Sequence, residues 1–215
     1  MRKAHDSPMR LIQIQQNIYV RYVMVLWVEA KTGREKSRMI MPSVTQVLQP
    51  WSDFSMIPAA VLEAASVRGT AVHDVCATIA RGLPVVNEPI TVKGYVTSYR
   101  RWFDLVVDRV LLVEERLVDT DFGYHGEPDL IILAKHGEII LVDNKTPLQL
   151  LRAWQLQCAG YWNLAAKKDI TPDKCGSLRL DPNGGIAKMQ YYDNSLNDFN
   201  LFVQALNLYR FFNRK

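Results

Sequence analysis

The spacing of apolar residues predicts four helices along the chain. Apolar side chains recur every three or four positions in residues 58–82, 92–110, 150–167 and 196–212. The first of these segments begins at Pro58 and stops at Gly82, which is followed by Pro84. Proline is favoured in the first turn of a helix and glycine just beyond the last, so both ends of this helix are marked in the sequence.

Between these helices the apolar residues alternate or run without a break, as they do in β-strands. Three successive strands are predicted at residues 111–118, 125–134 and 138–146, with a turn at 135–137, and two short strands flank a turn at 183–185. The run at 139–142 is apolar on both faces, as in a central strand covered by helices. The order of elements predicts an α/β or mixed α+β fold with helices flanking a mixed central sheet.

The N-terminal segment is predicted to be an addition to this fold. Residues 18–41 alternate around the turn-forming triplet Lys31-Thr32-Gly33, which predicts a β-hairpin. The chain has 215 residues, enough for one substantial core and a tight fit for a second full domain. The prediction is therefore a single domain, with residues 1–41 as an extension and residues 42–215 as the core.

Composition excludes some classes of protein. The chain is 48% hydrophobic and 22% charged, and no apolar run approaches the roughly 20 residues of a membrane-spanning helix, so no membrane association is predicted. The basic N-terminus lacks the features of a secretory signal, which predicts a cytoplasmic protein. Three cysteines without a CxxC pair argue against a disulfide framework or a thiolate metal cluster. A formal net charge of +4 is compatible with a polyanionic partner but does not decide for one.

Acidic residues in two neighbouring strands supply the candidate chemistry. Asp129 lies in GEPDLI and Asp143 in LVDNKT. Side chains two apart in a strand share a face, so Asp143 and Lys145 should point the same way, as should Glu127 and Asp129. Carboxylates next to a buried strand are costly unless they are paired or bind a cation, and their oxygens suit Mg²⁺ or Mn²⁺. The lysine could orient or help deprotonate an attacking water and stabilise charge on phosphorus.

The signature at these positions resembles that of the PD-(D/E)XK nucleases. GEPD, which ends at Asp129, is followed after thirteen residues by Asp143-Asn144-Lys145, and VDNKT resembles the form found in RecB-like and phage-type exonucleases. Upstream, RGTAVH from Arg68 to His73 is similar to a helical RG-x-x-x-H element of the family.

Aromatic residues at helical spacing, such as Trp154, are predicted to face the core rather than to stack on DNA bases.

Two further elements of the family have counterparts in the expected order. VEERLV supplies an acidic position on the first core strand, for which Glu114 is preferred to Glu115. QLQCAGY matches a Q-x-x-x-Y element at Gln157 and Tyr161, which would share one helical face and could meet one DNA strand or brace the lysine. PSVTQVLQPW and FVQALNLYRFF also resemble phage-type members, so the resemblance extends over residues 42–212.

The resemblance implies a restriction-endonuclease-like core and a metal-dependent DNA nuclease, specifically an exonuclease of phage-type recombination, repair or DNA processing. It implies that one or two Mg²⁺ or Mn²⁺ ions are held by His73, Asp129, Asp143 and the backbone carbonyl of Asn144. It implies catalytic roles for Asp129, Asp143, Lys145 and Glu114. It implies substrate contacts from Arg68, Thr146, Arg152, Gln157 and Tyr161.

The implied partners and cofactors follow the same family. DNA is the expected partner, together with a homo-oligomer or a recombination partner protein, in the cytoplasm of a bacterial host cell if the protein is phage-encoded. Some RecB-like relatives hold an iron–sulfur cluster with four cysteines, and three scattered cysteines predict that this chain has none.

Several alternatives stay open at this point. Asp143 and Lys145 taken alone could be a structural ion pair. Glu127 stands where related proteins often have a small or hydroxyl residue, and could be a further metal ligand or only alter the local field. Gly69 in a helix would allow either close packing on the sheet or approach of a phosphate. The whole chain could be a catalytically silent nucleic-acid-binding accessory protein, or a structure- or sequence-specific endonuclease.

Overall fold

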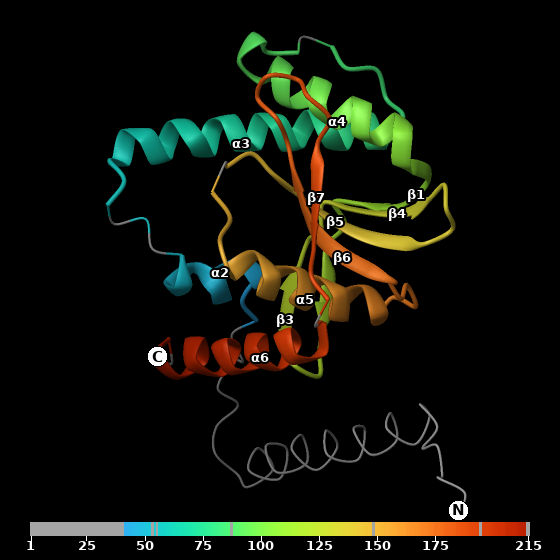
Figure 1. The fold of residues 1–215 in the computed structure, drawn as a ribbon. Helices are drawn as coiled ribbons and strands as arrows, with labels where there is room; N and C mark the ends of the chain where they lie inside the picture. Colours follow the sequence, from blue (N-terminus) through green and yellow to red (C-terminus); the bar gives the residue numbers. More distant parts are fainter. Residues whose placement is uncertain are drawn as a thin grey trace, which may run out of the picture. The chain divides into compact units, whose positions relative to one another are not determined.

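A five-stranded mixed sheet forms the centre of the fold (Figure 1). The computed structural model describes residues 41–52, 54, 56–86, 88–147, 149–193 and 195–213. The strands of this sheet, in chain order, are β1 (Val107–Val113), β4 (Leu130–Ala134), β5 (Ile139–Lys145), β6 (Lys174–Arg179) and β7 (Lys188–Tyr191). They lie side by side in the order β1-β4-β5-β6-β7, and only β5 and β6 run parallel. The predicted mixed α/β class is confirmed, and the topology is consistent with a restriction-endonuclease-like core.

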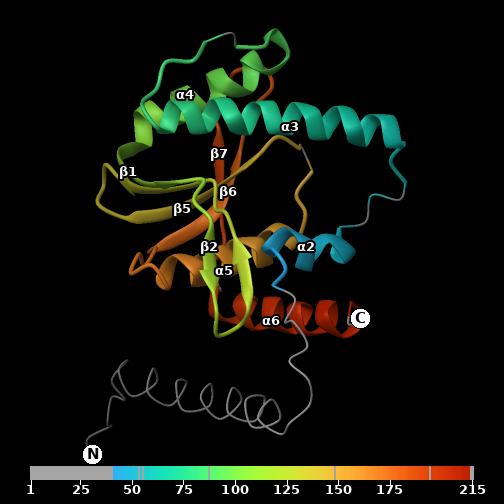
Figure 2. The same cartoon turned by 180° about the vertical axis from the view of Figure 1, so that it is seen from behind.

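Helices cover both faces of the sheet. The helices and 3-10 turns are α2 (Val44–Leu48), η1 (Gln49–Trp51), α3 (Ala59–Ala80), η2 (Ile90–Val92), α4 (Lys93–Val106), α5 (Ala153–Ala166) and α6 (Ser195–Phe212). Figures 1 and 2 show α3 and α4 on one face and α5 on the other, with α6 and α2 packed against α5. None of the described helices is both long enough and apolar enough to cross a membrane.

Strand β5 is the central element because both of its faces are buried. Ile140 and Val142 belong to the core cluster beneath α3 and α4, whereas Leu141 points to the opposite face and is also fully buried. Alternation then directs Asn144 toward α3 and both Asp143 and Lys145 toward α5. The predicted central strand is thus confirmed, and its last residues place polar groups on both faces.

The predicted boundaries of the second helix and of the first two strands are wrong. The second helix ends at Val106 rather than at 110, and the first strand occupies Val107–Val113 instead of 111–118, because the β-branched and apolar residues after Val106 pair with β4. The strand predicted at 125–134 is divided at Pro128 into β3 (Tyr124–Gly126) and β4, and β3 pairs with β2 (Leu117–Asp119) in a separate two-stranded sheet. Proline lacks the N–H that a continuous ladder requires.

The sequence analysis did not predict the helix that precedes α3. The short helix α2 begins after Ser43, whose side chain accepts the N–H of Gln46 while the Gln46 side chain accepts the N–H of Ser43. This reciprocal cap is legible in the sequence as Ser-x-x-Gln, and it holds α2 against α5 and β3. The predicted hairpin at 18–41 lies outside the described residues.

Gly126 and Gly69 differ in the space that each leaves for a side chain. A Cβ atom at Gly126 would lie 2.7 Å from Cε1 of Tyr161 and 2.9 Å from Cδ1 of Leu164, both on α5, whereas a Cβ atom at Gly69 would have Oγ1 of Thr146, at 3.9 Å, as its nearest neighbour. Gly126 is therefore required by the packing of α5 on β3. Close packing does not require Gly69, because an added Cβ atom would only make ordinary van der Waals contact with Thr146.

We expect Gly126→Ala to destabilise the protein by about 1–3 kcal/mol, because the Tyr161 ring would have to move. Gly69→Ala, the matched control, should stabilise it by up to about 1 kcal/mol through helix propensity. Urea unfolding of both variants beside the wild type measures the two changes. Equal effects of the same sign would contradict this account of the packing.

Candidate active site

The sequence-predicted site residues converge where β4 and β5 meet helices α3 and α5. Asp129 directly precedes β4, while Asp143 and Lys145 end β5. Leu130 pairs with Val142 in the antiparallel ladder. The ladder ends at this pair, so Asp129 and Asp143 are the residues immediately beyond it on the two strands.

Asp129 is held from two sides. Its Oδ1 atom lies 3.1 Å from Nδ1 of His73 on α3, and its Oδ2 atom accepts the backbone N–H of Asn144 at 2.6 Å. Burial raises the pKa of Asp129, but the charges of His73 and Lys145 and the Asn144 hydrogen bond outweigh it, so the net shift is downward. Asp129 is thus ionised at neutral pH.

Asp143 and Lys145 form a buried ion pair on the α5 side of the sheet. Oδ2 of Asp143 lies 2.6 Å from Nζ of Lys145, and the two side chains are 3% and 13% exposed. Burial lowers the pKa of Lys145, but the carboxylates of Asp143 and Asp129 raise it overall, so the lysine is an ammonium group. For Asp143, burial raises the pKa and the nearby Asp129 carboxylate raises it further. The Lys145 charge opposes this change without reversing it, and the increase caused by Asp129 is the effect of repulsion between two like charges.

Helix α5 supplies a glutamine that connects these groups. Gln157 accepts a hydrogen bond from Nζ of Lys145 at 3.1 Å, and its Nε2 atom lies 3.2 Å from the Tyr161 hydroxyl and 3.4 Å from Oδ1 of Asp143. Residues four apart share a helical face, which is why one glutamine reaches both the lysine and the tyrosine. Gln157 therefore contacts the lysine, and the contact of this element with a DNA strand stays a prediction.

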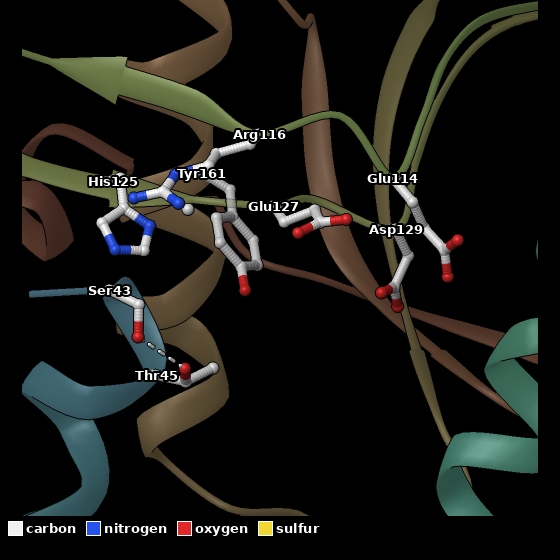
Figure 3. A pocket seen from close by; sticks show the side chains of 9 residues that line it. Ser43, Thr45, Glu114, Arg116, His125, Glu127, Asp129 and Tyr161 are labelled. Atoms are coloured by element: carbon white, nitrogen blue, oxygen red, sulfur yellow. Dashed lines mark hydrogen bonds between the residues drawn. The ribbon is translucent and has the colours of Figure 1, made fainter.

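A cavity of about 360 Å³ opens beside Asp129. Figure 3 shows Glu114, Glu127 and Asp129 at one end and Ser43, Thr45, Arg116 and His125 at the other, with the Tyr161 ring between them. The two ends therefore differ in charge, and the acidic end is the one that adjoins the buried ion pair. Tyr161 is the residue through which α5 contributes to the wall of this cavity.

The structure separates Glu114 from Glu115. Glu114 follows β1 with a positive φ of 42°, donates its N–H to the Asp129 carbonyl at 3.2 Å, and pairs with Arg81 at 3.1 Å. Burial raises the pKa of Glu114, and the Arg81 charge opposes that change. Glu115 instead pairs with Lys168 away from the cavity. Glu114 is thus the acidic residue beside Asp129, as preferred from the sequence.

Other predicted substrate residues are not in contact with the ion pair. Thr146 is buried facing Gly69, and Arg152 is exposed at the start of α5. Arg68 lies with its guanidinium 6.0 Å from the centre of the Tyr95 ring, and its Nε atom is buried without a hydrogen bond. Arg68 lies on α3, Thr146 directly follows β5 and Arg152 directly precedes α5, and their contacts with a substrate strand stay predictions.

The backbone of Asn144 is oriented as the proposed ligand role requires. Its N–H points to Asp129, and the N–H and C=O of one strand residue point to the same side. The carbonyl oxygen of Asn144 is therefore directed toward the Asp129 side of β5. The Asn144 side chain points toward α3, away from the face that carries Asp143 and Lys145, and its Oδ1 atom is buried there without a hydrogen bond.

The donor set fits a hard divalent cation, although the ligands are not assembled around one. Within the described residues, no three His, Cys, Asp or Glu side chains are close enough together to hold an ion as they stand. The two repelling carboxylates would be relieved by a cation, and Oδ2 of Asp143 is buried with no hydrogen bond apart from its ion pair. Mg²⁺ commonly binds through one or two carboxylates and retains waters, so the complete set is not needed in advance.

Sequence reasoning missed the basic and hydroxyl end of the cavity. None of Ser43, Thr45, Arg116 and His125 is among the site residues predicted from the sequence, yet all four line the cavity with Asp129. They come from α2 and the β2–β3 hairpin, which approach the site only through the fold; Ser43 bridges His125 across that junction. The Ser-x-x-Gln cap could have revealed α2, but not its neighbours.

Comparison with known proteins adds little to this geometry. No protein-family model matches the sequence, and no curated protein matches it. The chain is similar to the crystal structure of SSO0001, with 14% identity, a TM-score of 0.43, and coverage of 92% of this chain and 87% of that one. It is also similar to LHK-Exo in complex with dAMP, with 14% identity, a TM-score of 0.38, and coverage of 78% and 86%. At these values neither similarity indicates a function for this chain.

The His73–Asp129 pair should make stability depend on pH in the absence of metal. Burial lowers the pKa of His73, but the Asp129 carboxylate more than compensates and raises it from 6.5 to about 9. The pair's contribution is then complete below pH 6.5 and is lost as pH rises through about 9. His73→Asn should remove about 1–3 kcal/mol of this pH dependence.

Urea unfolding in a chelator at about pH 6 and about pH 9.5 tests this expectation. His136→Asn is the control, because His136 is 56% exposed in a surface pair with Glu138. The same pH dependence in the wild type and His73→Asn would show that the pair does not form.

Proposed function

We propose that this chain is a Mg²⁺- or Mn²⁺-dependent deoxyribonuclease that hydrolyses phosphodiester bonds. The observation that supports it is the convergence of Asp129 and Asp143 beside the Lys145 ammonium, at the acidic end of an open cavity. Two carboxylates that repel each other beside a cavity lower stability, and a purely structural ion-pair network would not require them there. In this proposal residues 42–215 act as one nuclease domain, with residues 1–41 as an extension.

His73, Asp129, Asp143 and the Asn144 carbonyl would hold one or two ions, assisted by Glu114. When bound, a divalent ion lowers the pKa of a coordinated water and neutralises charge on the phosphate. His73 would have to give up its proton to become a ligand, because only the neutral imidazole coordinates a metal. The Asp129 pair that raises the pKa of His73 is therefore the contact that must change on metal binding.

Lys145 carries the positive charge that the proposed role at the phosphate requires. It is an ammonium held by Asp143 and Gln157, so it acts as a fixed cation that orients the water and stabilises negative charge developing on phosphorus. Gln157 would keep the lysine in place, and Tyr161, which lines the cavity, would contact the substrate strand. Arg68, Thr146 and Arg152 would contact the strand outside the cavity.

We further propose that the enzyme acts from DNA ends, as an exonuclease of phage-type recombination, repair or DNA processing, in the cytoplasm. The full-length chain, incubated with Mn²⁺ or Mg²⁺, should release nucleotides from linear DNA and leave covalently closed circular DNA intact. Cleavage of the circle would identify an endonuclease instead. Failure to cleave either substrate by protein shown to be folded would overturn the nuclease proposal and leave a nucleic-acid-binding accessory protein.

Removing the lysine should separate catalysis from metal binding. We expect Lys145→Ala to lower turnover at least about 100-fold while Mn²⁺ still binds, because the lysine acts on the phosphate and does not hold the ion. Asp143→Asn should lose both Mn²⁺ binding and DNA cleavage. Calorimetric titration with Mn²⁺ and cleavage rates at saturating metal give the two measurements.

Lys174→Ala is the matched control. Lys174 begins β6, whereas Lys145 lies beside Arg179 at the end of that strand, and Lys174 forms an exposed ion pair with Glu138, 2.8 Å away. Its cleavage rate should equal that of the wild type. Lys145→Met retains the apolar stem and guards against misfolding of the alanine variant, because loss of one partner of a buried pair is destabilising. A folded Lys145 variant with an unchanged rate would exclude the proposed role.

A further inference from the structure

The indole ring of Trp154 covers the ammonium group of Lys145. Trp154 lies in the first turn of α5 and is 6% exposed, and the Lys145 Nζ atom is 5.3 Å from the centre of its ring. A cation within about 6 Å of a tryptophan ring centre is attracted by the electron-rich face of the ring. The contact is therefore an interaction with the charge of the lysine as well as a packing contact.

Trp154 and Gln157 reach the lysine from the same helix. They are three residues apart, so their side chains lie on one face of α5. Gln157 accepts a hydrogen bond from Nζ at 3.1 Å, and Oδ2 of Asp143 lies 2.6 Å from the same atom. The ammonium is thus contacted by a carboxylate, an amide oxygen and an aromatic face. With its side chain 13% exposed, Lys145 has little freedom left to reorient.

This enclosure matters because a lysine is intrinsically mobile. Its four-carbon stem carries about 2 kcal/mol of rotamer entropy, and an ammonium has no planar geometry that would fix its direction. The Asp143 ion pair sets a distance but leaves the ammonium free to swing around the carboxylate. A ring face and an amide oxygen on α5 restrict that motion, and they do so before any substrate arrives.

We propose that Trp154 is a positioning residue for Lys145, which holds the ammonium in the orientation that the reaction uses. The inference rests on the proposed nuclease function for its catalytic consequence, but the contact itself can be tested without it. Trp154 acts through the lysine and does not touch the substrate. The aromatic face, rather than the bulk of the side chain, is the property that matters.

Two substitutions distinguish the aromatic face from simple filling of space. Trp154→Phe keeps a smaller ring face, whereas Trp154→Leu keeps an apolar side chain and loses the ring. We expect Trp154→Leu to lower kcat by about 3- to 30-fold relative to Trp154→Phe, with little change in KM, because the lysine acts on the transition state. Trp162→Leu, on the same helix with its Nε1 donating to the Pro172 carbonyl at 3.0 Å, is the control and should leave kcat unchanged.

The contact is measured separately by NMR on the full-length chain labelled with ¹³C in its lysines, without metal or DNA. The Lys145 Cε and Hε signals, assigned with Lys145→Arg, should be shifted by the ring current in the wild type and in Trp154→Phe. They should move to the position of an ordinary lysine in Trp154→Leu. Urea unfolding establishes which variants are compared at similar stability.

The outcomes separate this inference from the function on which it rests. If the wild type cleaves DNA and the Leu and Phe variants have the same kcat, Trp154 does not position the lysine. An unshifted Lys145 signal in the wild type overturns the inference whether or not the protein is a nuclease. A shifted signal that Trp154→Leu abolishes, in a protein that cleaves no DNA, overturns the proposed function while the contact stands.

Discussion

The repulsion between two carboxylates governs the arrangement of this site. Asp129 and Asp143 lie beside each other at the end of a buried strand, where an unpaired charge would be strongly unfavourable. Each carboxylate has acquired its own partner, His73 from α3 for one and Lys145 from β5 for the other. Helix α3 contacts the pair of acids through His73, and α5 contacts it through Gln157, whose Nε2 atom lies 3.4 Å from Oδ1 of Asp143.

The sheet provides the geometry that brings the acids together. The ladder between β4 and β5 extends as far as Leu130 and Val142, and Pro128 lies just before β4. Beyond that point the N–H of Asn144 donates to the Asp129 side chain rather than continuing a regular ladder. The place where β4 begins thus turns a strand backbone into part of the site, with the Asn144 carbonyl directed the same way.

Helix α5 performs several tasks with one face. Trp154, Gln157 and Tyr161 are spaced by three and four residues, so they follow one another along the helix toward the cavity. Trp154 and Gln157 contact the lysine, and Tyr161 continues into the cavity wall over Gly126. The position of α5 on the sheet therefore affects both the lysine and the shape of the cavity.

The sequence determined the features that depend on local spacing. Helical and strand periods identified α3, α5, α6 and β5, and strand alternation placed Asp143 and Lys145 on one face, because these patterns need no knowledge of distant segments. Element boundaries around 106 and 128 were decided by pairing between β1 and β4 and by Pro128, which competes with local propensity. Only the tertiary structure showed that Trp154, predicted as a core residue, also faces the Lys145 ammonium, and that Ser43, Arg116 and His125 line the cavity beside Asp129. Those neighbours lie far apart in the chain, and packing rather than spacing brings them together.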